Sequence, residues 1–183
     1  MSEPLLSVKN MKKTFQANGG MFSKKKFVHA VNDVSFDIYP GETFSLVGES
    51  GCGKSITSLA LMGLLPASAR IVSGEMNFRR QDLRKLSPRE YADLRGSELA
   101  MIFQEPMTSL NPAFTLGDQL SEAVMRHQTI SRAEAMTVAL QILEKVQIPA
   151  AEMRLKAYPH QLSGGMRQRV MIAMALINHP KLL

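Results

Sequence analysis

One short segment of the chain combines residue types and spacing that suit a nucleotide phosphate. It fits the phosphate-loop pattern over eight consecutive residues: Gly48, Glu49, Ser50, Gly51, Cys52, Gly53, Lys54 and Ser55. The glycines let the backbone curl so that successive N–H groups point at phosphate oxygens. Lys54 would reach the β- and γ-phosphates, and the Ser55 hydroxyl would bind Mg²⁺. The pattern predicts a nucleotide site with Mg²⁺, but it does not choose the base.

The segments on either side of this loop favour a functional site over a chance glycine-rich turn. The apolar run Thr43–Val47 before it is typical of a buried strand. Apolar residues then recur with helical spacing from Ile56 until Pro66 stops the pattern. Strand, loop and helix therefore follow in the order that a phosphate loop requires.

A second glycine-containing segment could bind an anion. Ser163, Gly164 and Gly165 precede a helical stripe of apolar residues that runs from Met166 to Ile177. The N–H groups at such a helix start suit a γ-phosphate. The alternative is that Ser163 is a simple helix N-cap.

Gln104 is a candidate for both metal binding and catalysis. It follows Leu99–Phe103, a predicted short buried strand, and its amide oxygen could join the Mg²⁺ shell and orient the attacking water. The alternative is an exposed loop amide. We expect Lys54 and Gln104 to be catalytic, and Ser55 and Gln104 to bind the metal. The four histidines are far apart in the sequence, so their spacing indicates no metal site.

The remaining sequence divides into a β-rich opening and a helical part. Partial alternation predicts strands over Leu5–Phe15, Val28–Ile38 and Ile71–Phe78. In the helical part, Ser131 and Glu134 form a capping box. We expect one α/β domain over residues 1–183, with a β-rich core that carries the phosphate loop at 1–113. A helical subdomain at 114–160 and a last segment at 161–183 would follow.

Composition narrows the class of protein. A chain of 183 residues that is 45% hydrophobic and 21% charged is typical of one globular domain. Its longest apolar runs fall well short of the ~20 residues that span a bilayer, and residues 1–11 lack a signal core, which predicts a cytoplasmic protein. The net charge of +6 is scattered, so it gives little reason to expect nucleic acid. The single cysteine excludes an internal disulfide framework.

Three motifs together resemble those of the ATP-binding subunits of ABC transporters. Leu162–Met166, followed by Gln168 and Arg169, resembles the family signature, and Met101–Pro106 resembles the Q-loop. The phosphate loop lies at a fitting distance from both. The resemblance runs from about Leu5 to the last residue and implies a P-loop ABC ATPase fold with ATP as the nucleotide.

The resemblance also implies how ATP is held. In this family, the signature of one subunit closes on the ATP in the phosphate loop of its partner. A head-to-tail dimer is therefore implied, in which Ser163, Gly164 and Gly165 contact the partner's ATP. By comparison with the family, Phe15 is better placed than Phe22 to stack on adenine, although Phe15 could equally be a core residue.

Other segments resemble one group within the family. Gln104–Pro112 resembles the Q-loop continuation of ATPases that drive uptake of dipeptides, oligopeptides, glutathione and nickel in bacteria, and Tyr158–Gln161 fits the same group. The part from Met101 onward is most similar to dipeptide or glutathione importers. In contrast, Val28–Glu42 is more similar to the sister subunit of oligopeptide importers.

This group couples ATP binding and hydrolysis to peptide uptake at the cytoplasmic face of the inner membrane. The implied partners are a second ABC ATPase subunit, transmembrane permease subunits and, indirectly, a periplasmic or extracellular substrate-binding protein. Met125 and Met136 are candidates for a groove that meets the permease. Two alternatives stay open: an ABC ATPase that acts on nucleic acid or ribosomes, which Gln104–Pro112 disfavours, and a non-catalytic nucleotide-binding fragment.

The end of the chain bears on hydrolysis. In the family, the acidic residues that hold Mg²⁺ and act on water lie on a strand that begins about where Lys181–Leu183 stands. Neither acid is present in the sequence, so we expect a chain that is incomplete at its C-terminus and hydrolyses ATP poorly alone. The sheet edge that the missing strand would leave exposed should promote aggregation. We also expect thiol reagents to modify Cys52 unless ATP protects it.

Overall fold

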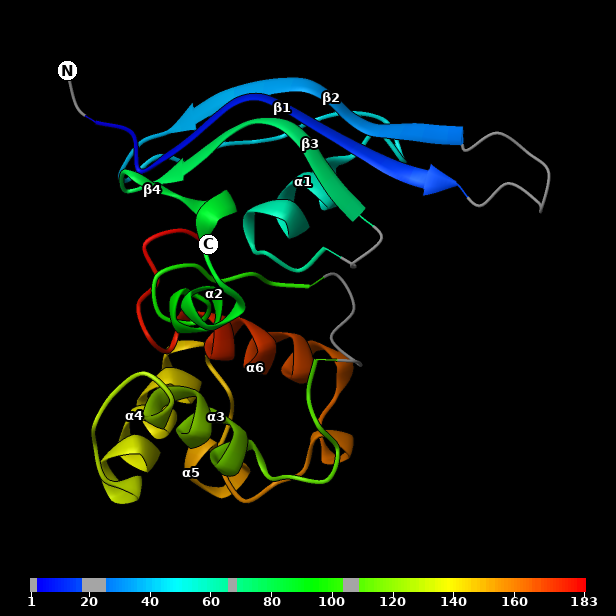
Figure 1. Cartoon of the computed structure of the whole chain (residues 1–183). Helices are drawn as coiled ribbons and strands as arrows, with labels where there is room; N and C mark the ends of the chain where they lie inside the picture. The colour runs from blue at the N-terminus through cyan, green and yellow to red at the C-terminus, as the bar shows by residue number, and fades with distance from the viewer. Residues whose placement is uncertain (1–2, 18–25, 66–68, 104–108) are drawn as a thin grey trace. The chain divides into compact units, whose positions relative to one another are not determined.

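The chain forms two compact units, Met1–Tyr91 and Ala92–Leu183, each with its own elements (Figure 1). The structure, a computed structural model, describes residues 3–17, 26–65, 69–103 and 109–183. Among these residues, no helix is both long enough and apolar enough to span a membrane. The expected division at residues 113 and 160 remains a prediction.

An antiparallel sheet of four strands, in the order β2-β1-β3-β4, is the base of the first unit. The strands are β1 (Leu6–Ala17), β2 (Lys26–Ile38), β3 (Ala69–Phe78) and β4 (Gln81–Asp82). Helix α1 (Lys54–Leu61) lies along one face of this sheet in Figure 1. A short 3-10 turn, η1 (Leu83–Lys85), and helix α2 (Pro88–Leu94) follow β4. The three strands predicted from alternation are confirmed, with small shifts at their ends.

A bulge interrupts the alternation of the three long strands at one level of the sheet. Asn10 of β1, Asp33 of β2 and Gly74 of β3 all have positive φ angles, of 49°, 61° and 105°. The Asn10 backbone N–H donates to the Ser35 hydroxyl at 2.8 Å, and its side-chain amide donates to Asp33 at 3.0 Å. The register of β1 shifts against both neighbours here, between Val8 and Met11 on one side. The strands therefore bend together without losing their pairing.

The prediction of a buried strand at Thr43–Val47 is wrong. These residues belong to no strand in the described part of the chain, and all five are exposed, Val47 by 89%. The Phe44 ring stacks on Phe36 of β2, with ring centroids 4.9 Å apart. A buried strand needs hydrogen-bonding neighbours along its edges, and no described strand pairs with this segment.

Helices make up most of the second unit. They are α3 (Leu116–Met125), α4 (Arg132–Lys145), α5 (Ala151–Arg154), the 3-10 turn η2 (Pro159–Gln161) and α6 (Gly164–Leu176). Helix α3 packs against α4, and both contact α6. The predicted capping box is confirmed: the Glu134 backbone N–H donates to the Ser131 hydroxyl, and the Ser131 backbone N–H donates to the Glu134 carboxylate.

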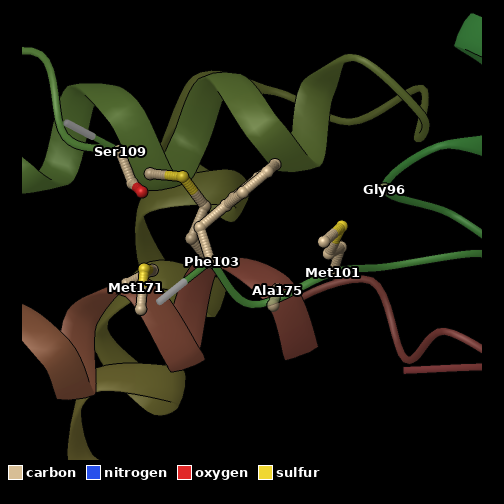
Figure 2. A pocket seen from close by; sticks show the side chains of 7 residues that line it. Gly96, Met101, Phe103, Ser109, Met171 and Ala175 are labelled. Carbon is tan, nitrogen blue, oxygen red and sulfur yellow. The ribbon is translucent and has the colours of Figure 1, made fainter. Parts of the chain in front are cut away.

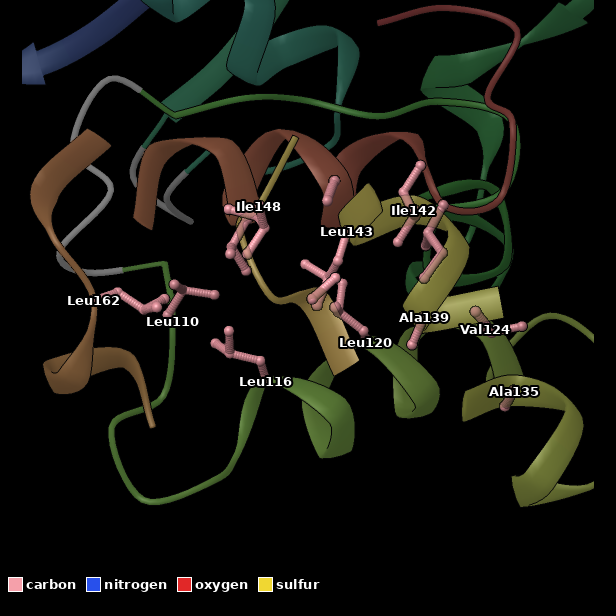
Figure 3. Packing of buried hydrophobic residues seen from close by; sticks show 14 residues of the cluster. Leu110, Leu116, Leu120, Val124, Ala135, Ala139, Ile142, Leu143, Ile148 and Leu162 are labelled. Carbon is pink, nitrogen blue, oxygen red and sulfur yellow. The ribbon is translucent and has the colours of Figure 1, made fainter. Parts of the chain in front are cut away.

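Apolar side chains from these helices form one core (Figure 3). Leu116, Leu120 and Val124 recur along α3 with helical spacing and are fully buried. Ala139 and Leu143 of α4 lie in the same cluster. The small Ala side chains let the helices approach closely. Val170 and Ala173 of α6 belong to the same cluster.

The predicted strand at Leu99–Phe103 is reduced to two isolated parallel bridges at Leu99, one with Arg95 and one with Leu182. Leu99 pairs with Leu182, and the Ala100 N–H donates to the Leu182 carbonyl oxygen at 2.9 Å. Leu99 and Ala100 are buried, but Phe103 is 43% exposed. The segment is only partly buried because its strand-like pairing is limited to a few residues around Leu99.

Candidate nucleotide-binding site

The phosphate loop is an irregular turn that leads directly into α1. Gly53 is the N-cap of the helix, with φ 96° and ψ 4°, a left-handed conformation that favours glycine. A Cβ atom at Gly53 would collide with the Ala30 carbonyl oxygen and lie 3.1 Å from a Val31 methyl group. At Gly53 the phosphate loop therefore approaches strand β2 more closely than a residue with a Cβ atom would allow.

A buried threonine fixes the start of α1. Thr57 donates to the Gly53 carbonyl oxygen from its backbone N–H at 2.9 Å and from its hydroxyl at 3.0 Å. Thr57 is only 3% exposed. The first turn of α1 contains no acidic residue, so the positive end of the helix dipole is not compensated there. Such an end attracts phosphate.

The Lys54 ammonium lies over the loop. It donates to the carbonyl oxygens of Gly48 at 2.6 Å and Glu49 at 2.8 Å, and its Nζ atom lies 3.4 Å from the Cys52 sulfur. Cys52 itself is exposed. The Ser55 hydroxyl lies in the first turn of α1, and Ser55 is exposed. The loop and the first turn of α1 thus bring together one cation and one exposed hydroxyl, a pair that fits a phosphate chain with a divalent cation.

A cavity of about 480 Å³ lies between the loop and strand β2. Ala30, Val31, Asn32 and Val34 form the strand side of its wall. No sequence pattern predicted this wall, because these residues precede the loop by many positions and have no chemical signature. Lys13, the cross-strand partner of Val31 in β1, was also missed: it is fully buried, and burial lowers the pKa of its ammonium group.

The segment predicted to be a second anion site, 163–165, is also open to solvent. Ser163 caps α6, accepting a hydrogen bond from the Met166 N–H at 3.4 Å. Gly164 and Gly165 are exposed, and a Cβ at either position would have no atom within 4 Å. The first turn of α6 contains no acidic residue. Ser163 is therefore an N-cap, and the accessible N–H groups beside it could still bind an anion.

Two predicted site residues cannot be placed. Gln104 lies outside the described residues. The backbone of Phe15 is part of β1, where it pairs with Val28, but its side chain lies outside the described ones. Among the residues that the structure does describe, no group of three or more His, Cys, Asp or Glu side chains could hold a metal ion.

Two further hollows lie in the second unit. The first, of about 390 Å³, is lined by Gly96, Met101, Phe103, Ser109, Met171, Met174 and Ala175. Figure 2 shows Ser109 and Met171 on one side of Phe103 and Met101 on the other. The second, of about 690 Å³, we call the α3 groove. Its apolar residues are Phe114, Ala123, Met125 and Met174, and its polar residues are Asn111, Gln119, Glu122 and Arg126.

Comparison with known proteins identifies the family. The family model described as "ABC transporter" matches residues 31–183, so this chain belongs to the ABC transporter family. The dimeric post-hydrolysis structure of the ATP-binding cassette MJ0796, bound to ADP and Pi, superposes with a TM-score of 0.80 at 27% identity, covering 96% of this chain and 70% of that one. The expected α/β fold of an ABC ATPase is confirmed.

The curated relatives are ATP-binding proteins of peptide transport and glutathione import. The dipeptide transport ATP-binding protein DppD of Bacillus subtilis is 52% identical over 182 residues, which are 99% of this chain and 52% of the relative. The oligopeptide transport ATP-binding protein OppD of Escherichia coli is 48% identical, over 100% of this chain and 52% of the relative. The glutathione import protein GsiA of E. coli O157:H7 is 47% identical over 98% of the chain and 29% of its own length. The chain thus spans about half the length of DppD and OppD.

Proposed function

We propose that this chain is the ATP-binding part of an ATPase subunit that drives peptide uptake in bacteria. The observation that carries the proposal is the geometry of the phosphate loop. The N-cap position of α1 at Gly53 fits only glycine, and no acidic residue in the first turn of α1 compensates the helix dipole. The Lys54 ammonium lies over the loop. Each of these features suits the phosphates of ATP.

Mg²⁺ would be held by the Ser55 hydroxyl and the Gln104 amide oxygen. The exposed Ser55 side chain in the first turn of α1 supports this assignment. When bound, Mg²⁺ would neutralise negative charge on the β- and γ-phosphates. Lys54 binds the same phosphates, and Phe15 stacks on adenine. Gln104 orients the attacking water.

A second subunit would complete the site. Ser163, Gly164 and Gly165 bind the γ-phosphate of the ATP held by a partner subunit in a head-to-tail dimer. Their open N–H groups and the dimeric state named for MJ0796 support this arrangement.

The names of the relatives support dipeptides, oligopeptides or glutathione as cargo. The subunit would lie at the cytoplasmic face of the inner membrane against permease subunits, with a substrate-binding protein as an indirect partner. The α3 groove is the proposed contact with the permease. Met125 lines this groove, whereas Met136 packs against Gly117 of α3.

Equilibrium binding of a fluorescent ATP analogue, with and without Mg²⁺, tests the nucleotide proposal. We expect saturable binding that Mg²⁺ strengthens and that unlabelled ATP displaces better than GTP. Equal displacement by GTP would contradict the adenine assignment, and unsaturable binding would contradict the site itself. Co-purification with a peptide permease from membranes tests the transport role separately.

A further inference from the structure

Lys13 places a cation inside the sheet of the first unit. Its side chain is fully buried, although lysine is among the residue types that proteins rarely bury completely. In β1 it pairs with Val31 of β2 on one side and with Ile71 of β3 on the other, so strands flank it on both edges. The aliphatic part of lysine packs well in a core, but its ammonium group loses hydration there. Packing alone does not account for a lysine at this position.

The Lys13 side chain lies on the face of the sheet that meets the phosphate loop. Residues directly opposite each other on antiparallel strands project from the same face, so Lys13 and Val31 share one face. Val31 faces the loop, because one of its methyl groups lies 3.1 Å from the position that a Cβ atom would take at Gly53. The Cα atoms of such cross-strand partners are about 5 Å apart. Lys13 is therefore one strand away from the residue that lies beside the loop.

The cavity beside the loop offers this cation no carboxylate. None of the described residues that line the cavity is acidic, and neither is any residue in the first turn of α1. Glu49 belongs to the loop, but it is exposed and does not line the cavity. Charges in such a poorly hydrated region act over longer distances than in water. A buried cation here therefore adds to the positive potential that an anion in the loop would meet.

Burial and a bound nucleotide act on the Lys13 ammonium in opposite directions. Burial lowers the pKa of Lys13, because removal from water disfavours the charged form. Phosphates bound in the loop would favour the charged form, because a nearby opposite charge stabilises it. Coupling between two groups is reciprocal, so the charged lysine would strengthen phosphate binding by the same factor.

We propose that Lys13 is a second cation of the nucleotide site, held in β1 beneath the phosphate loop, and that it strengthens the binding of polyphosphate without contacting it. Lys54 binds the phosphates directly, whereas Lys13 acts on them through its electrostatic field. This inference rests on the proposed function, which supplies ATP as the ligand. The position and the burial of the cation come from the structure.

Two variants of the full chain remove the charge in different ways. Lys13→Met keeps an unbranched apolar side chain, and Lys13→Gln keeps a hydrogen-bond donor. We expect each to raise the Kd for MgATP about threefold to tenfold in a titration with a fluorescent ATP analogue. Lys9→Met is the matched control, because it removes the same charge from an exposed position of the same strand. It should leave the Kd unchanged.

Inorganic tripolyphosphate separates an effect on the phosphates from an effect on the base. It carries the phosphate charge without adenine or ribose, and it displaces the fluorescent analogue when it occupies the loop. In the presence of Mg²⁺, we expect Lys13→Met and Lys13→Gln to weaken tripolyphosphate by about the same factor as MgATP. A change on the adenine side of the site would weaken MgATP alone.

Thermal unfolding separates an electrostatic role from a structural one. Replacing a buried cation by an apolar side chain removes a desolvation penalty, so Lys13→Met should melt no lower than the wild-type protein. Equal MgATP affinity in the wild type and both Lys13 variants would overturn the inference. So would unchanged tripolyphosphate binding, or a loss of affinity confined to variants that also melt at lower temperature. A wild-type protein that binds no ATP would instead contradict the proposed function.

Discussion

The Nζ atom of Lys54 donates to the carbonyl oxygen of Gly48, 2.6 Å away, so the lysine of the phosphate loop contacts the loop's first glycine. A second hydrogen bond reaches the Glu49 carbonyl oxygen at 2.8 Å. Carbonyl oxygens satisfy the donors of the ammonium group but carry no net charge. The cation is therefore positioned and still available to the phosphates of a nucleotide.

Replacing Lys54 should weaken ATP binding more than it weakens the fold. We expect Lys54→Met to raise the Kd for MgATP about tenfold to hundredfold, the range for a lost charge-assisted hydrogen bond. Lys145→Met on α4 removes the same charge from an exposed site outside the loop. Titration of a fluorescent ATP analogue distinguishes them, and equal Kd values for the two variants would contradict the role of Lys54.

Gly53→Ala should disrupt both the loop and the stability of the first unit. The added methyl group would meet the Ala30 carbonyl oxygen at a residue with φ 96°. We expect a loss of about 2 kcal/mol or more in the free energy of unfolding, and loss of ATP binding. Gly165→Ala is the control, since its Cβ would have open space and Ala favours helix. Urea denaturation of both variants measures the contrast, and equal stabilities would argue against the close approach.

Cys52 should report occupancy of the loop. Its thiol is exposed and lies 3.4 Å from the Lys54 ammonium, so a maleimide attached there would fill the space above the loop. We expect alkylation to abolish ATP binding, and MgATP to slow alkylation, as followed by mass spectrometry. Cys52→Ser should bind ATP and resist the reagent. Alkylation at the same rate with and without MgATP would show that the nucleotide lies elsewhere.

Acid should weaken the start of α3. The Thr115 hydroxyl donates to Asp118 at 2.6 Å and Arg132 pairs with it at 2.5 Å, and these contacts, chiefly the hydroxyl, hold the pKa of Asp118 below its ordinary value. A lowered folded-state pKa gives stability that is present above the unfolded-state pKa of about 4 and is lost as pH falls through the folded-state value.

Asp118→Asn should therefore destabilise the protein at pH 7 and have a smaller effect near pH 3. Thermal unfolding at a series of pH values measures this difference. Glu144→Gln provides the comparison, since the Glu144 carboxylate has no side-chain partner in the part of the chain that the structure describes. A destabilisation by Asp118→Asn that is the same at both pH values would rule out the carboxylate contacts as its cause.

Local signals in the sequence predicted local structure well. The Ser131–Glu134 capping box and the Gly48–Ser55 loop depend on residues a few positions apart, and the structure contains both the cap and the turn into α1. Such features are fixed by hydrogen bonds within one or two turns of chain, which a pattern can capture.

Features that depend on distant partners were not predictable. The apolar run Thr43–Val47 has strand-like residues, but burial requires neighbouring strands, and none in the described part of the chain pairs with it. Nor could the pattern foresee that Val31 would form a wall of the nucleotide cavity, or that Lys13 would be fully buried. Those positions are set by sheet register, which the bulge shifts between Val8 and Met11.

The residues with a left-handed backbone conformation that lie side by side in the sheet also bear on how the chain avoids misfolding. Asn10, Asp33 and Gly74 occupy the bulge, and these residue types tolerate positive φ better than most. If β2 slipped by one residue, Val34 would take the position of Asp33, where a β-branched side chain is strongly disfavoured. The bulge therefore penalises wrong pairings during folding, and acts as a register lock that holds β2 against the phosphate loop.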